Sequence, residues 1–130
     1  MIHELDIETL TKLVVRKINE IGNREIVLQN PTDKSVFPCT VVRAPMERPR
    51  IGEGATPVYT RFSISTEEWA NTQYECMTQA HQTTLKLREY NFKKVSNDIP
   101  LYDEITKKYR LISNYEVNYN GLTNSFELIK

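Results

Sequence analysis

The first clear pattern in the chain is an apolar stripe close to the N-terminus. Apolar residues recur there three and four positions apart, at Ile7, Leu10, Val14, Ile18 and Ile21. This spacing places them on one face of an α-helix. Asp6 before the stripe is a good N-cap, and Gly22 after it is a common helix stop. The pattern therefore predicts a helix over residues 6–21.

Three strands are predicted in the next part of the chain, at residues 24–30, 36–44 and 58–65. The third is the most regular, because Phe62 and Ile64 fall on one face while polar residues fall on the other. A turn that begins at Asn30-Pro31 separates the first two, since proline cannot donate to a strand ladder.

The sequence ISTEEW at 64–69 has the composition of a helix N-terminus. Ser65 would be the N-cap, and Glu68, three residues later, would complete a capping box. Ile64 and Trp69 would form the accompanying hydrophobic staple. We therefore expect a long central helix from Ser65 to about residue 90, with an inner stripe made largely of small and polar side chains.

The last part of the chain predicts an irregular return at 90–108, with one turn of helix near Asp103, and then a β-hairpin. The first strand of the hairpin, 109–119, alternates with a two-residue period. One of its faces carries Tyr109, Leu111, Ser113, Tyr115, Val117 and Tyr119. We interpret this face as core packing under the helices rather than a base-stacking surface, because it lacks clustered Lys and Arg. Asn120-Gly121 favours a type I′ turn into a final strand at 125–129.

Together these elements predict one α+β domain over residues 1–130. Its sheet is expected to be mostly antiparallel, with four to five strands, and to pack against the N-terminal helix and the long central helix. A long β–β loop is expected at 43–57, RAPMERPRIGEGATP, which holds three prolines and two glycines. Loops beyond about 12–15 residues are uncommon unless they have a function or are disordered.

The charged residues of that loop are the candidate interface residues: Arg43, Glu47, Arg48, Arg50 and Glu53. Because Arg makes geometry-specific, bidentate contacts with carboxylates, the three arginines are expected to contact a neighbouring subunit or ring. The two acids are expected to pair with bases on a neighbouring subunit. The alternative, that all five are solvated loop charges, stays open.

Composition limits the classes of function. The chain carries 17 basic and 17 acidic residues, which argues against a dedicated nucleic-acid-binding protein, because such a protein has a basic excess or stripe. No apolar run approaches the roughly 18 residues of a membrane helix, and the N-terminus lacks the pattern of a secretory signal. Cys39 and Cys76 are expected to be buried, reduced thiols of a protein made in the cytoplasm.

The residues that could carry chemistry form no recognisable catalytic motif. His3 and His81 are isolated, and no pair of His or Cys has metal-ligand spacing. Asp98, Asp103 and Glu104 could mimic the acidic cluster of a metal-dependent nuclease, but we favour a solvated loop followed by a helix start. We therefore predict no catalytic, metal or cofactor site, and no enzymatic activity.

The order of elements, with the segments FPCTVVRAP, RFSISTEEWA and YRLISNYEVNYNG, resembles the small tail-terminator and tail-completion proteins of long-tailed bacteriophages. The resemblance covers nearly the whole chain. It implies a structural virion protein, made in the bacterial host cytoplasm and located at the head–tail junction. Such proteins form a hexameric ring that caps the head-proximal end of the tail tube, ends tube polymerisation and presents a surface to the capsid neck.

The partners that the resemblance implies are other copies of the chain, the tail tube protein and a neck or head-completion protein. DNA would pass through the lumen of the ring without sequence-specific binding, and no cofactor or membrane is implied. A ring of this kind needs two different patches on each subunit, because its contacts are head-to-tail. The alternatives are a head–tail joining or neck protein of the same fold, and a small nucleic-acid-binding or nuclease module.

Overall fold

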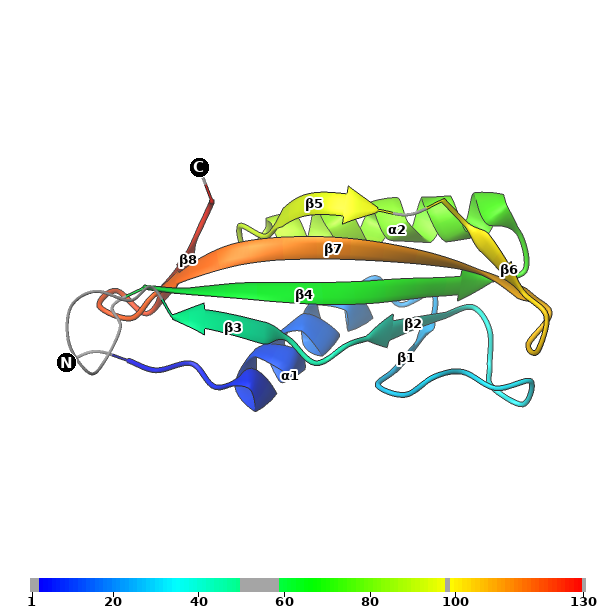
Figure 1. Cartoon of the computed structure of the whole chain (residues 1–130), viewed down its shortest axis with the longest axis horizontal. Coiled ribbons are helices and arrows are strands. Elements are labelled where there is room, and N and C mark those ends of the chain that lie inside the picture. Colours follow the sequence, from blue (N-terminus) through cyan, green and yellow to red (C-terminus); the bar gives the residue numbers. More distant parts are fainter. Residues whose placement is uncertain (1–2, 50–58, 98, 130) are drawn as a thin grey trace.

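The computed structural model describes residues 3–49, 59–97 and 99–129 (Figure 1). Within these residues, two helices pack on one face of an eight-stranded sheet. The helices are α1 (Ile7–Asn19) and α2 (Gln73–Arg88). The strands are β1 (Glu25–Val27), β2 (Cys39–Val42), β3 (Met46–Pro49), β4 (Tyr59–Ala70), β5 (Lys93–Asn97), β6 (Leu101–Asp103), β7 (Lys108–Asn120) and β8 (Ser125–Glu127).

Two long antiparallel strands, β4 and β7, form the centre of the sheet. Along the outer edge of β4 lie β3 and then β2, and β1 lies parallel to β2 beyond it. Along the outer edge of β7 lie β8, β5 and β6, each antiparallel to it. The α+β class is confirmed. The prediction of four to five mostly antiparallel strands is only roughly met. The sheet has eight strands, of which three have just three residues, and it is mixed because β1 runs parallel to β2.

Helix α1 forms where the apolar stripe predicted it. Asp6 is its N-cap, and Asp6 Oδ1 accepts a hydrogen bond from the backbone N–H of Thr9 at 2.6 Å. Leu10, Val14 and Ile18 are completely buried. They join the main core, to which both helices and the central strands contribute.

The predicted capping box at Ser65 and Glu68 is wrong, because these residues belong to β4. Between Thr66 and Trp69 this strand is hydrogen-bonded on both sides, to β2 and to β7, and a helix there would lose both ladders. Helix α2 starts at Gln73 instead. Its N-cap is Thr72, whose side-chain oxygen accepts from the backbone N–H of Glu75 at 3.1 Å.

Two segments that were predicted to be irregular contain strands. In the predicted loop 43–57, β3 pairs with the first part of β4. In the predicted return 90–108, β5 and β6 pair with β7, and the expected helical turn near Asp103 is a turn between β6 and β7. Strands this short carry too few residues for a two-residue period to be recognised, so pairing with the long central strands decides them.

The alternating face of β7 is core, as predicted. Leu111, Ser113, Tyr115, Val117 and Tyr119 are all buried. The Tyr115 hydroxyl lies 2.9 Å from the Thr84 hydroxyl of α2, which gives the buried phenol a hydrogen-bond partner.

The hairpin after β7 lies where Asn120-Gly121 predicted it, but it is not a two-residue type I′ turn. Asn120 pairs with Ser125, so four residues form the loop. The positive φ falls on Asn124, at 53°. The Asn120 side chain stabilises the turn, because its Oδ1 accepts from the backbone N–H of Leu122 at 2.9 Å.

Candidate functional site

The helices leave the second face of the sheet without a helical cover, and Figure 1 looks onto this face, where β4 and β7 cross the molecule in full view. The cross-strand register places alternate residues of both strands there. Its central members are Arg61, Ser63, Ser65, Asn114, Glu116 and Asn118, all partly buried. We call these six residues the uncovered face. These six positions are polar, whereas the same face carries a buried apolar cluster of Cys39, Val41 and Trp69 where β4 pairs with β2.

The charges around the uncovered face are mixed. Arg61 Nη1 lies 3.7 Å from Glu116 Oε2, a long and partly exposed pair of small energetic weight. The guanidinium of Arg110 lies 5.7 Å from the centre of the Trp69 ring, within cation–π range. Where the structure describes it, the face therefore carries no continuous basic stripe of the kind that tracks a phosphate backbone.

Two polar atoms on the uncovered face have no hydrogen-bond partner within the described part of the chain. They are Arg61 Nε and Asn118 Oδ1, and both are buried. Arg61 and Asn118 are directly opposite one another in the β4–β7 register. Buried polar atoms are usually hydrogen-bonded, so these two atoms are exceptions within the described part of the chain.

Arg43, the first predicted interface residue, is bonded within the chain. Its Nε donates to Glu67 Oε2 at 2.6 Å, and its Nη2 donates to Asn30 Oδ1. Glu67 is only 5% exposed, so Arg43 supplies a counter-charge to a nearly buried carboxylate. Arg43 was predicted to contact a partner; within the chain its guanidinium links the β1–β2 connection to β4.

The other four predicted residues are only partly described. Glu47 lies on β3 and is exposed, and Arg48 is next to it, opposite Arg61 in the β3–β4 register. Arg50 and Glu53 lie outside the described residues. Strand β3 therefore brings Glu47 and Arg48 to the edge of the sheet beside the uncovered face.

A second polar group, which the sequence did not reveal, is buried between α2 and the sheet. Arg24 Nη1 lies 2.9 Å from Glu68 Oε2, and both side chains are fully buried. Glu68 also accepts hydrogen bonds from the hydroxyls of Thr40 at 2.5 Å and Thr83 at 2.8 Å. Arg24 Nη2 donates to Gln82 Oε1 at 2.6 Å. The network connects the turn after α1 with β2, β4 and α2.

This buried network stabilises the fold and offers no open site for chemistry. Burial raises the pKa of the Glu68 carboxyl, and the Arg24 guanidinium with the Thr40 and Thr83 hydroxyls opposes that rise. A signal for it was present in the sequence. If the alternation of Phe62 and Ile64 is extended, Glu68 falls on the inward face of the same strand.

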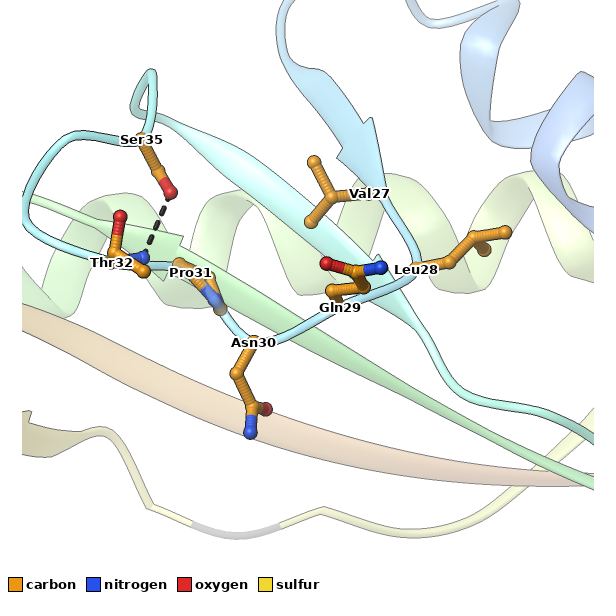
Figure 2. A pocket seen from close by; sticks show the side chains of 7 residues that line it. All are labelled: Val27, Leu28, Gln29, Asn30, Pro31, Thr32 and Ser35. Atoms are coloured by element: carbon orange, nitrogen blue, oxygen red, sulfur yellow. Dashed lines mark hydrogen bonds between the residues drawn. The ribbon is translucent and has the colours of Figure 1, made fainter.

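An open hollow of about 500 Å³ lies along the connection from β1 to β2, and Figure 2 shows the side chains that line it. Its lining consists of Val27, Leu28, Gln29, Asn30, Pro31, Thr32 and Ser35. Ser35 Oγ accepts from the backbone N–H of Thr32 at 2.8 Å. None of the seven residues has a titratable side chain, so the hollow provides hydrogen-bonding groups but no acid–base pair.

Of the residues considered for metal or acid–base chemistry, those that the structure describes form no cluster that could hold a metal ion. His81 is exposed on α2. Asp103 Oδ2 accepts from the backbone N–H of Thr106 at 2.9 Å and from its hydroxyl at 2.8 Å, so this carboxylate fixes a turn. Asp98 lies outside the described residues. In the ranges that the structure covers, no group of three His, Cys, Asp or Glu side chains could hold a metal ion.

Cys39 and Cys76 are buried, as predicted, in separate apolar clusters. Neither described helix is long and apolar enough to cross a membrane. No protein-family model matches the chain, and no curated protein matches it.

Proposed function

We propose that this protein is a structural subunit of a homo-oligomeric ring that caps the head-proximal end of a bacteriophage tail tube. In the tail-terminator family, which the sequence resembles, this ring is hexameric. In this role it ends tube polymerisation and supplies the surface to which the capsid neck joins. The observation that carries the proposal is the uncovered polar face of the β4–β7 pair, next to sheet edges that have no partner strand among the described residues.

The geometry suits a subunit that is completed by its neighbours. Helices cover one face, and the other offers partly buried polar side chains, among them Ser63, Ser65 and Asn114. Interfaces between proteins contain about one hydrogen bond per 100–200 Å², and their composition is more polar than that of a core. The uncovered face has this composition, and its paired charges favour a protein partner over a nucleic acid.

The same surfaces serve the neighbouring role of a head–tail joining or neck protein. The two roles differ in the partner, because a terminator binds the end of the tube and a neck protein binds the head-completion ring. Binding to purified tubes distinguishes them.

The proposal is tested by adding the purified protein to growing tail tubes of the phage that encodes it. We expect tubes to stop elongating, with a ring at one end in negative-stain images. Tubes that keep growing at the same rate with bare ends would overturn the terminator role. Binding to the head-completion protein in the same experiment would identify the neck role instead.

Charge reversal tests the candidate interface residues. We expect the Arg48→Glu/Arg50→Glu double variant to lose tail joining while its far-UV circular dichroism stays unchanged. Lys12→Glu is the control, because Lys12 is exposed on α1 and pairs only with Glu8 among the described residues. Normal joining by the double variant would remove these arginines from the interface.

A further inference from the structure

The sheet ends on each side in a strand with a single partner. In the part of the chain that is described, β1 pairs only with β2, and β5 pairs only with β7. A strand of this kind presents a row of unpaired backbone N–H and C=O groups, which is a template for pairing with another chain. The two strands lie at opposite ends of the strand order, β1-β2-β4-β7-β5.

The directions of the two edge strands are compatible with mutual pairing. Strand β1 is parallel to β2, and β2 and β7 are each antiparallel to β4, so β1 and β7 run the same way. Strand β5 is antiparallel to β7 and hence to β1. A second copy placed beside the first would therefore add its β1 to β5 as an antiparallel neighbour, which is the commoner pairing in sheets.

The charges of the two edge strands are complementary. The charged residue of β1 is Glu25, and those of β5 are Lys93 and Lys94. Glu25 is opposite Cys39, and Lys93 is opposite Glu116, so the registers place both Glu25 and Lys93 on the face that lacks helices. Both side chains are exposed, and neither forms an ion pair with another described residue.

Strand β5 contains a β-bulge at which one residue has no cross-strand partner on β7. Val95 falls at the register shift between Lys94 and Ser96, so it has no partner on β7, and it is 45% exposed. Strand β6 is less suitable, because its one charged residue, Asp103, is an acid like Glu25 of β1. The pairing therefore favours β5 over β6.

We propose that β1 of one copy adds to β5 of the next copy, with Glu25 beside Lys93, so that the sheet continues from subunit to subunit. This inference rests on the self-assembly in the proposed function and names its contact. The contact is head-to-tail, because β1 and β5 are different patches, and such contacts generate a closed ring when the rotation closes. A β5-to-β5 contact between two copies would instead bring lysines together, which is unfavourable.

A charge swap tests the pairing in the full-length protein. The variants are Glu25→Lys, Lys93→Glu and the double variant, compared by sedimentation velocity and native mass spectrometry, with and without tail tubes. Each single change places like charges opposite one another, so we expect assembly to need about fivefold more protein, and the double variant to return to within about twofold of wild type. Added salt should shrink these differences, because exposed pairs are screened.

Two controls match the changes in net charge. Glu104→Lys alters an exposed acid in the turn after β6, and Lys12→Glu alters an exposed base on α1. Both are expected to assemble like wild type. Single variants that also assemble like wild type, or a double variant no better than the singles, would overturn the β1–β5 contact. Stronger self-association of Lys93→Glu alone would indicate a β5-to-β5 contact, and this result would also overturn the β1–β5 contact.

Tube capping, measured in parallel, separates this inference from the proposed function. Charge-sensitive assembly without capping would refute only the terminator role. Capping that is unaffected by the swaps would refute only the β1–β5 contact. A protein that stays monomeric at all concentrations and never binds tubes would refute both.

Discussion

Removal of Arg24 should destabilise the fold severely, because this residue supplies the only described counter-charge of the buried Glu68 carboxylate. The change Arg24→Met keeps most of the side-chain volume and removes the guanidinium. Glu68 then retains the Thr40 and Thr83 hydroxyls as donors, but no cation. Breaking a buried ion pair by deleting one partner costs about 3–5 kcal/mol. Because two hydroxyl bonds remain, we expect about 3 kcal/mol.

This loss is large compared with the whole stability of a domain, which is typically about 5–15 kcal/mol. The double variant Arg24→Met/Glu68→Met should recover about 1–3 kcal/mol of it, since no buried charge is left unpaired. Recovery is expected to be incomplete, because the Thr40 and Thr83 hydroxyls lose their acceptor. The interaction energy from the complete cycle then measures the coupling between Arg24 and Glu68.

Urea unfolding at pH 7, followed by the fluorescence of the single Trp69 and by far-UV circular dichroism, measures these free energies. Lys12→Met is the control, because its pair with Glu8 is exposed and should contribute less than about 0.5 kcal/mol. An Arg24→Met variant within about 1 kcal/mol of wild type would refute the structural role of the network. A double variant as unstable as the sum of the single changes would show that the two residues are not coupled.

Three further predictions concern local features. Thr72→Ala should cost about 1 kcal/mol in urea unfolding, while Thr72→Asp, which still caps, should not; equal losses would contradict the N-cap assignment. Hydrogen bonds from Thr106 lower the pKa of Asp103 below its usual 3.8, so its stabilisation is present above pH 3.8 and is lost as pH falls through the folded-state pKa. The stability gap between wild type and Asp103→Asn should therefore close at low pH, and a constant gap down to acid unfolding would refute this. Burial raises the pKa of the Cys39 thiol to about 12 and that of Cys76 to about 11, so a thiol reagent at pH 8 should modify neither before unfolding, and rapid modification would contradict their burial.

The two possible capping boxes show where local sequence is ambiguous. Ser65–Glu68 and Thr72–Glu75 have the same spacing of a hydroxyl residue and a glutamate, and both precede helix-compatible residues. Only the second caps a helix. The first is held in β4 by two neighbouring strands, which come from distant parts of the chain. The prediction failed because such pairing has no trace within a six-residue window.

The candidate interface was predictable to a similar extent. Composition singled out the segment 43–57, and the structure places Glu47 and Arg48 from it on an edge strand beside the uncovered face. The same reasoning did not reveal that Arg43 is bonded within the chain, because its acceptors Glu67 and Asn30 lie on separate elements. It did not single out Lys93 and Glu25, the residues of the proposed β1–β5 contact, because their place depends on which strands end the described sheet.

The sequence by itself determined the helix α1, the inward face of β7, the positions of the main turns and the α+β class. These features follow from periods of 3.6 and 2 residues and from capping and turn residues, all of which act within a few positions of one another. Tertiary structure alone decided that Glu68 is a buried partner of Arg24, that β3, β5 and β6 are strands, and which strands end the described sheet. Each of these depends on contacts between residues far apart in the chain, and a local pattern does not encode which distant residues meet.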